Sequence, residues 1–223
     1  RQNDDLRISW GIIEQKEYNL NLNRLQALSV QDGLLRQPFG LCSISAEVAG
    51  GSSEKQDYVT KLYPLLHFSE LSNFLETIMP EYSLPADEDM NPLPTRSRKR
   101  YVIRSSIPVL VVVVLLQMLP YGWVFLLLLP PSILLGLARY KAGRTAIGEK
   151  QLTFRFRNIN RYHVFVLKNH IQSLQISSNP FQRRSDLGTV RVSVLSSPAG
   201  KDFKVSDVDK WENEKIWRWF SRS

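Results

Sequence analysis

One stretch of the chain, at positions 105–138, has no formal charge, and all 29 Lys/Arg and all 21 Asp/Glu residues lie outside it. An uncharged, mainly apolar run of about 18 residues or more is typical of a membrane-spanning helix. A single helix over the whole stretch would be far too long for a hydrocarbon core about 30 Å thick, because each residue adds about 1.5 Å. Near the middle of the run, the sequence PYG at 120–122 has the composition of a tight turn. We therefore predict two short transmembrane helices, 102–119 and 122–138, joined by that turn.

Basic residues flank this run on both sides. Positive charge within about 15–20 residues of a membrane helix marks its cytoplasmic end. Basic flanks at both ends therefore predict a hairpin whose two ends face the cytoplasm, since a single span would place one cluster on the opposite side. A re-entrant hairpin that does not fully cross is the alternative, and it also leaves the rest of the chain in the cytoplasm. The flanking residues are Arg96, Arg98, Lys99, Arg100 and Arg104 before the run, and Arg139 and Lys141 after it.

An internal repeat relates the parts of the chain on the two sides of the hairpin. When residues 6–40 are laid on residues 152–186, the apolar positions coincide, and NRLQALSV at 23–30 lies on NHIQSLQI at 169–176. After a two-residue insertion, FGLCSISAEV at 39–48 matches LGTVRVSVLS at 187–196. Both copies alternate apolar and polar residues in short runs, the pattern of antiparallel strands with one buried face. Each copy closes with one amphipathic helix, for which Ser69 and Ser206 are the predicted N-caps.

These patterns predict an α+β fold with two antiparallel β-barrel or sandwich modules, each with a C-terminal helix, separated by the transmembrane hairpin. The first module covers residues 1–80 and a linker covers 81–101. The hairpin covers 102–138 and the second module 139–223. The first module is expected to lack its opening strand, which would precede Arg1, so the chain is expected to be a portion of a longer polypeptide. The WRWFSRS sequence that follows the last helix resembles a natural C-terminus.

Three strand patterns resemble a known family, the second class of bacterial pleckstrin-homology (PH) domains. They are LRISWG at 6–11, NRLQALSV at 23–30 and PFGLCSISAEV at 38–48. With paired helices between two such domains, the whole chain resembles the YdbT-type membrane proteins of Gram-positive bacteria. The second copy departs from the pattern, because His170 stands in place of Arg24 and Asn158 in place of Gly11. The resemblance implies PH-like modules on the cytoplasmic face of a bacterial cell membrane, with further copies and another helix pair upstream.

The sequence contains no arrangement typical of catalysis or of metal binding, so we predict neither an enzyme nor a cofactor, and no small-molecule substrate. Nucleotide-binding, nucleophile-elbow and zinc-protease motifs are missing, and the three histidines are scattered singly. Cys42, the only cysteine, occupies an alternating position and is expected to be a small buried hydrophobe. The acidic run 87–89 lies in a Pro-containing linker, where solvated charge is expected.

Four residues of the two sheets are candidate contacts with a lipid or a partner. Arg183 and Arg184 lie in the loop NPFQRRSDLG, and a guanidinium group suits phosphate; the alternative is a solvated loop. Arg24 and Gln26 form the polar signature of the repeat, and they either contact a partner or fix the register of the sheet. The tryptophans at 217 and 219 either anchor the last helix at the membrane surface or pack on the sheet.

The net charge of +8 is unevenly distributed. Residues 1–80 carry 7 Lys/Arg against 10 Asp/Glu, whereas residues 145–223 carry 14 against 7. Basic excess beside membrane helices favours anionic lipid over nucleic acid, for which no recognition motif is present. We therefore predict a membrane-anchored scaffold for binding or assembly at the cytoplasmic face, related to the cell envelope, that self-associates or recruits other membrane proteins. The alternative is binding of anionic lipid headgroups by the basic second module.

Overall fold

The chain forms two adjoining groups of strands and a pair of helices that projects from the second group. The computed structural model describes residues 5–10, 16–49, 59–119, 121–196 and 200–222. The first unit comprises β1 (Asp5–Trp10), β2 (Lys16–Asn21), β3 (Leu25–Asp32), β4 (Leu41–Val48), β5 (Val59–His67) and helix α1 (Leu71–Ile78). The arm comprises α2 (Arg98–Leu116), the 3-10 segment Gly122–Leu128 and α3 (Leu129–Ala142). The second unit comprises β6 (Asn91–Pro92), β7 (Arg144–Ile147), β8 (Gln151–Arg157), β9 (Arg161–Leu167), β10 (Ile171–Ser177), α4 (Pro180–Arg183), β11 (Leu187–Val194), β12 (Lys201–Asp209) and α5 (Lys210–Ser221).

One pair of strands has the same register in both units, and this register corrects one prediction. Leu28 of β3 pairs with Ala46 of β4, and their counterparts in the second copy, Leu174 and Val192, pair in the same way. The offset between the copies therefore stays constant through β4 and β11, and the predicted two-residue insertion before them is wrong. That prediction aligned two glycines, Gly40 and Gly188, that occupy different places: the first follows a 3-10 turn and the second lies within β11.

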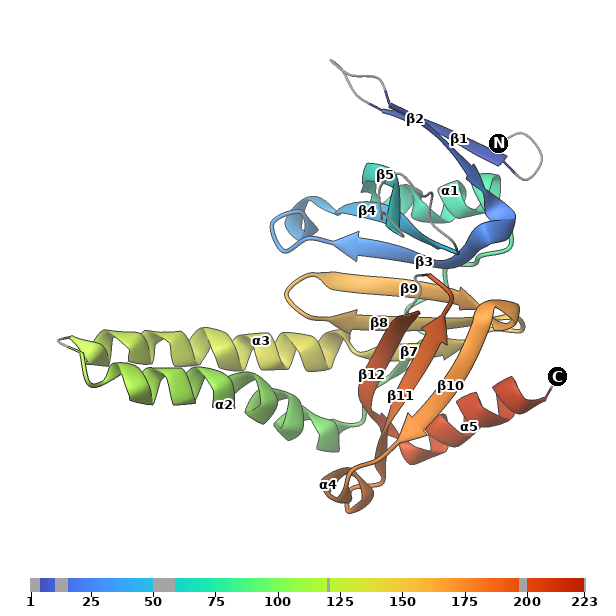
Figure 1. Cartoon of the computed structure of the whole chain (residues 1–223). Coiled ribbons are helices and arrows are strands. Elements are labelled where there is room, and N and C mark those ends of the chain that lie inside the picture. Colours follow the sequence, from blue (N-terminus) through green and yellow to red (C-terminus); the bar gives the residue numbers. More distant parts are fainter. Residues whose placement is uncertain (1–4, 11–15, 50–58, 120, 197–199, 223) are drawn as a thin grey trace.

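The two units share one continuous sheet (Figure 1). Its seven strands run in the order β5-β4-β3-β9-β8-β7-β6, so that β3 of the first unit pairs with β9 of the second. The pairing is antiparallel and extends from Ala27 opposite Val166 to Asp32 opposite Arg161. Strands β10, β11 and β12 form a separate sheet of three strands, and β1 and β2 a sheet of two. The β3–β9 pairing therefore holds the two units in a defined relative position.

Each unit has its own hydrophobic core, yet each core receives a side chain from the other unit. Phe165 of β9 is fully buried among first-unit residues such as Leu28 and Leu71. In return, Ala27 of β3 is buried in the core of the second unit. Cys42 is buried in the first core, as predicted, and its burial raises the pKa of the thiol to about 12.

The two predicted helix caps are wrong, because the flanking strand and turn extend further than expected. Ser206 lies within β12, which continues to Asp209, and Asp209 is the N-cap of α5: its carboxylate accepts a hydrogen bond of 3.1 Å from the backbone N–H of Trp211. Ser69 lies in the 3-10 turn Phe68–Glu70 that precedes α1, and its hydroxyl is 2.8 Å from His67 Nδ1. The short helix α1 therefore begins without the predicted serine cap.

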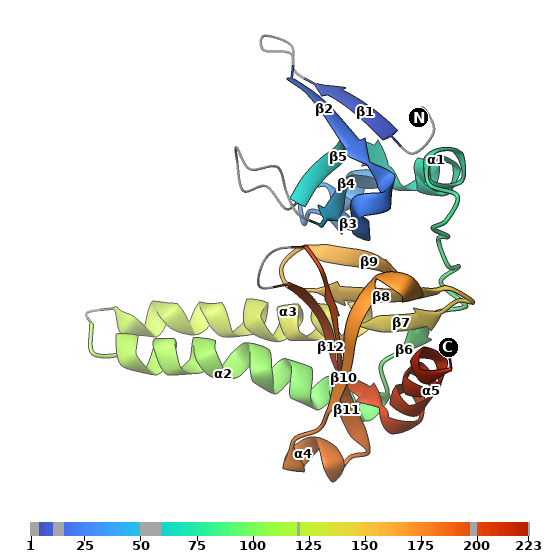
Figure 2. The same cartoon turned by 45° about the vertical axis from the view of Figure 1, so that its right-hand side comes forward.

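Helices α2 and α3 lie side by side and project from the second unit as one arm (Figures 1 and 2). The first helix begins at Arg98 and ends at Leu116, so it takes in part of the predicted linker, and the second continues to Ala142. Within the described residues, one helical segment, Gly122–Ala142, is long and apolar enough to cross a membrane, and 17% of its most apolar window is buried. Tyr121, at the tip between the two helices, adopts the left-handed conformation with φ of 64°.

Gly136 allows the two helices of the arm to approach closely. A Cβ atom at this position would lie 2.7 Å from the Cα of Val102 and 3.0 Å from the carbonyl oxygen of Tyr101. Because backbone atoms cannot rotate away, we expect Gly136→Val to force the helices apart at a cost of about 1–3 kcal/mol. Thermal unfolding in detergent would measure this loss. As a control, Leu134→Val alters an exposed residue of the same helix and should change stability by less than about 0.5 kcal/mol; equal melting temperatures for the two variants would contradict the close approach.

Candidate functional site

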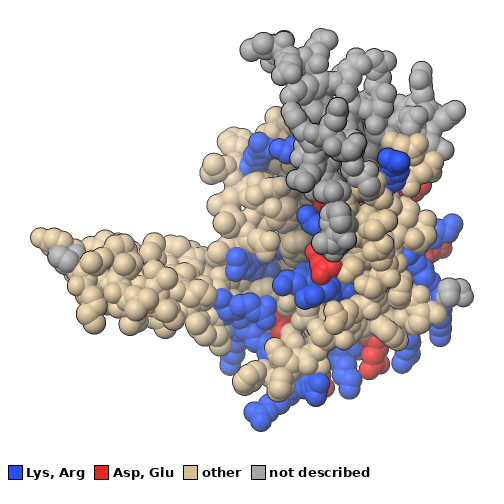
Figure 3. Space-filling view, in the orientation of Figure 1, with Lys and Arg blue, Asp and Glu red and all other residues tan. Residues whose placement is uncertain are grey.

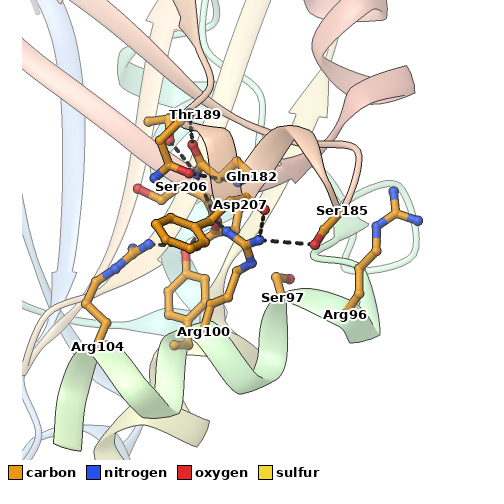
Figure 4. Close-up of polar contacts among 12 residues, drawn as sticks. Arg96, Ser97, Arg100, Arg104, Gln182, Ser185, Thr189, Ser206 and Asp207 are labelled. Atoms are coloured by element: carbon orange, nitrogen blue, oxygen red, sulfur yellow. Dashed lines mark hydrogen bonds and ion pairs between the residues drawn. The ribbon is translucent and has the colours of Figure 1, made fainter. Parts of the chain in front are cut away.

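The junction between the arm and the second unit contains a dense set of charged side chains (Figure 4). Arg96, Arg100 and Arg104 are spaced four residues apart and so share one face of the chain entering and forming α2. Arg96 donates to Asp209 Oδ2 at 2.6 Å, and Arg104 donates to Asp207 Oδ2 at 2.9 Å. Arg100 Nη1 lies 3.7 Å from Asp207 Oδ1. These arginines therefore attach the base of the arm to β12.

Asp207 is the centre of this junction. Its carboxylate is fully buried, and its backbone has a φ of 59°, in the left-handed region. Gln182, in α4, donates to Asp207 Oδ1 at 2.9 Å and to Thr189 Oγ1 at 3.0 Å, and a capping box with Asn179 holds Gln182 in place. A buried carboxylate is tolerated only when it is paired and hydrogen-bonded. Asp207 therefore joins the arm, α4 and β12 in one network.

Further contacts along α2 and α3 complete the attachment. Arg100 also donates to the carbonyl oxygen of Phe181, and to Ser185 Oγ at 3.1 Å. Tyr101 donates to the carbonyl oxygen of Ser206 at 2.8 Å, and Arg139 of α3 donates to that of Asn158 at 2.9 Å. Of the seven predicted flanking basic residues, four thus contact the second unit. The remaining three, Arg98, Lys99 and Lys141, are exposed.

A groove of about 660 Å³ lies beside this network, between the base of the arm and the strands of the second unit. It collects residues from both arm helices, from the turn after β8, and from β10, β11 and β12. None of the described residues that line it carries a carboxylate. The lining includes five basic residues, Arg104, Arg139, Arg157, Arg191 and Lys204, and four serine or threonine residues, Ser177, Ser178, Thr189 and Ser206.

The four candidate contact residues form two pairs, one in each unit. Arg183 and Arg184 are exposed at the end of α4, where Arg183 Nε donates to Ser178 Oγ at 3.4 Å. Arg24 is exposed in the first unit, and Gln26 donates to its carbonyl oxygen at 3.4 Å. The structure therefore does not gather these residues into one site. The sequence analysis did not predict the groove or the role of Asp207. The only sequence signal for Asp207 was an acidic residue in a segment rich in Lys and Arg.

Polar residues also line the boundary between the two units. Asp32 of β3 is buried and accepts a hydrogen bond from Arg161 Nε at 2.7 Å, and burial raises the pKa of its carboxyl group. Asp87 Oδ1 accepts a hydrogen bond from the buried Arg155 at 2.6 Å, and the carbonyl oxygen of Asp87 accepts one from Arg144. The acidic run 87–89 is therefore not simply solvated, because its first residue binds the second unit.

His163 of β9 makes this boundary sensitive to acid. Burial, with help from the neighbouring Arg161 and Arg155 and against the opposing effect of Asp87, lowers the pKa of His163 to about 3. An unfolded histidine has a pKa of about 6.5. The unfolded chain therefore takes up this proton first, and stability should fall as the pH drops from about 6.5 towards 3, by at most about 1.4 kcal/mol per pH unit.

The pH effect can be measured as the change in unfolding free energy between pH 7 and pH 5. We expect His163→Gln to flatten this dependence, because the substitution removes the buried imidazole. Asp32, which lies 3.7 Å from His163 Nε2, has the opposite effect at pH values above its unfolded pKa of about 3.9, because its raised pKa lets the folded state bind that proton first. An unaltered slope in His163→Gln would contradict a neutral, buried imidazole.

Among the described residues, no group of three or more His, Cys, Asp or Glu side chains is arranged to hold a metal ion. The histidine, cysteine and carboxylate positions discussed above serve the cores and the boundaries between elements. The arrangement at the base of the arm is instead suited to holding an anion by arginine, lysine and hydroxyl donors.

Comparison with known proteins identifies the family to which the chain belongs. The sequence model described as "Bacterial PH domain" matches residues 1–79 and 105–223. The chain is 33% identical over 225 residues to the UPF0699 transmembrane protein YdbT of Bacillus subtilis (strain 168), and the match covers 99% of the chain but 45% of that relative. The chain thus spans less than half the length of the relative. The predicted resemblance is confirmed, as is the mixture of helices and antiparallel sheets, and the chain belongs to the bacterial PH domain family.

Proposed function

We propose that this chain is part of a multi-pass membrane protein of the bacterial cell membrane, with the arm as a transmembrane hairpin. The exposed surface of the arm is apolar, including Val111, Leu115, Leu127 and Leu134, and one of its segments has the length and composition of a membrane span. Basic residues at the start of α2 and at the end of α3, both at the base of the arm, support a cytoplasmic position for both units. The relative's description as a transmembrane protein is consistent with this arrangement.

We further propose that each unit is a PH-like module, with domain limits near those predicted from sequence, and that the protein is a non-enzymatic scaffold for binding or assembly. The repeated strand registers and the closing helices α1 and α5 support two modules of one kind. The observation that carries the proposal is the seven-stranded sheet, which unites the two units in one body beside the arm. Such a body holds two sets of loops and strand edges at a fixed distance from the membrane. Strand edges and loops are the surfaces by which sheets recruit partners.

Photo-crosslinking in native membranes tests the scaffold. A photoreactive amino acid would replace Tyr63 on edge strand β5 or Trp217 on α5, both of which are exposed. We expect adducts larger than the monomer from at least one of these positions, either with a second copy or with another membrane protein. The matched control places the same group at Leu134 on the arm. Monomers alone from both unit positions would contradict the scaffold.

A second candidate function, binding of anionic lipid headgroups by the second unit, has support from one observation. Basic side chains are concentrated where the arm meets the second unit, beside the uncharged stretch of its two helices (Figure 3). The detergent-solubilised chain should bind dioctanoyl phosphatidylglycerol more tightly than dioctanoyl phosphatidylcholine, as measured by native mass spectrometry. Equal affinity for the two lipids would contradict this function. The variant Arg183→Gln/Arg184→Gln tests whether the predicted loop residues contribute.

A further inference from the structure

The groove at the base of the arm carries more positive charge than its ion pairs neutralise. Among its five basic side chains, Arg104 is neutralised by the buried Asp207. Arg139 and Arg157 donate to neutral acceptors, namely the carbonyl oxygen of Asn158 and the amide oxygen of Gln37. Neutral acceptors orient a guanidinium group but leave its charge in place. These two arginines therefore face the groove as positioned cations.

The strand side of the groove adds two exposed cations and several donors. Lys204 is exposed, and Arg191 lies 3.5 Å from Asp202, in a pair whose two side chains are both exposed to solvent. Thr189 and Ser206 contribute hydroxyl groups to the same lining. Arginine, lysine and hydroxyl groups that converge with no carboxylate among the described lining residues are suited to the oxygens of a phosphate group.

The surroundings of the groove place it at the level of a membrane surface. The turn between β3 and β4 and the turn between β8 and β9 lie on the side from which the arm projects (Figures 1 and 2). These turns expose large apolar side chains: Leu35 is 84% exposed, Phe39 70% and Ile159 61%. The two turns are joined by a hydrogen bond of 3.3 Å from the backbone N–H of Leu34 to Asn160. Exposed apolar side chains beside cations are characteristic of surfaces that dip into the interface of an anionic membrane.

We propose that the groove binds the phosphate group of an anionic phospholipid from the leaflet into which the arm inserts, with Arg191 and Lys204 as its accessible cations. The apolar turns would then lie among the acyl-chain ends of neighbouring lipids. This inference rests on the second candidate function and gives it a specific site, distinct from Arg183 and Arg184 on α4. The lipid is favoured over a soluble phosphate compound because the groove lies at the base of the arm and beside the turn that exposes Ile159.

The test uses the whole detergent-solubilised chain and native mass spectrometry with dioctanoyl phosphatidylglycerol. We expect Arg191→Gln/Lys204→Gln to raise the Kd for this lipid about tenfold, because each basic residue near an anionic headgroup contributes roughly a severalfold gain. The matched control, Lys61→Gln/Lys150→Gln, also removes two exposed charges but away from the groove, and it should bind as the wild type does. Thermal unfolding of both variants verifies that the fold is intact.

The outcomes distinguish lipid binding in the groove from lipid binding elsewhere on the second unit. If the wild type prefers phosphatidylglycerol but the groove variant binds it as well as the control does, the groove proposal is wrong while lipid binding stands. If the wild type shows no preference, lipid binding itself fails. Glycerol phosphate should compete only weakly with the lipid; competition at equal concentration would overturn the lipid assignment in favour of a soluble phosphate compound.

Discussion

Phe165→Ala should destabilise the first unit by about 3–5 kcal/mol, although Phe165 belongs to a strand of the second. The side chain is fully buried, and its neighbours are core residues of the first unit. Its removal leaves a cavity beside Leu28, to which Phe165 is directly paired across the β3–β9 ladder. Surrounding side chains cannot fill such a cavity completely, so both transfer energy and packing are lost.

Hydrogen exchange followed by mass spectrometry locates this effect. In Phe165→Ala, peptides from β3 and β4 should exchange faster than in the wild type, because the local opening free energy of the first unit falls. The matched variant Phe154→Ala removes an equally buried ring from the core of the second unit, and it should accelerate exchange in β8 and β11 instead. Phe181→Ala, at an exposed ring, controls for loss of a phenylalanine alone. Faster exchange confined to the second unit in Phe165→Ala would contradict the shared core.

Asp207→Ala should lower the free energy of unfolding by about 3–5 kcal/mol, the usual cost of removing one partner from a buried ion pair. The substitution leaves Arg104, Arg100 and Gln182 without their common acceptor. It also places alanine in the left-handed backbone conformation, which adds strain. Asp207→Asn separates these two causes, because asparagine tolerates that conformation but carries no charge.

Thermal unfolding in detergent gives the measurement. A loss of this size corresponds to a decrease in Tm of roughly 6–20 °C for a chain of this length. Asp202→Ala is the control, because Asp202 belongs to an exposed pair with Arg191 that should contribute less than about 1 kcal/mol. A double-mutant cycle with Arg104→Gln should show strong non-additivity. Additive effects, or a Tm of Asp207→Ala equal to that of the control, would contradict a role for Asp207 in holding the arm.

The features readable from the sequence are those that depend on local periodicity. Strand alternation predicted the strands of both units, and the uncharged run predicted the helices of the arm. The predictions were wrong where one short sequence pattern is compatible with more than one local structure. The serines at 69 and 206 are good caps in composition, but the strand and turn geometry around them assigned other residues to the helix starts. Likewise, Gly40 and Gly188 look equivalent in sequence and occupy different positions in the strand registers.

The candidate site was only partly predictable for the same reason. Basic residues beside the uncharged run were evident in the sequence. Which of them contact the second unit and which are exposed to solvent was not. That division depends on which face of α2 turns towards β12, and on the buried carboxylate of Asp207. The groove draws residues from segments far apart along the chain, from Tyr101 to Ser206, and no local pattern relates them.

The sequence by itself determined the antiparallel strands and an uncharged, apolar run flanked by positive charge. These follow from short-range hydrophobic periodicity and composition, which act along the chain. The tertiary structure alone decided that β3 pairs with β9, that Phe165 completes the core of the other unit, and that Asp207 ties the arm to β12. Strand edges carry the same backbone donors and acceptors everywhere, so the choice of pairing partner depends on the burial and charge complementarity gained when distant segments meet.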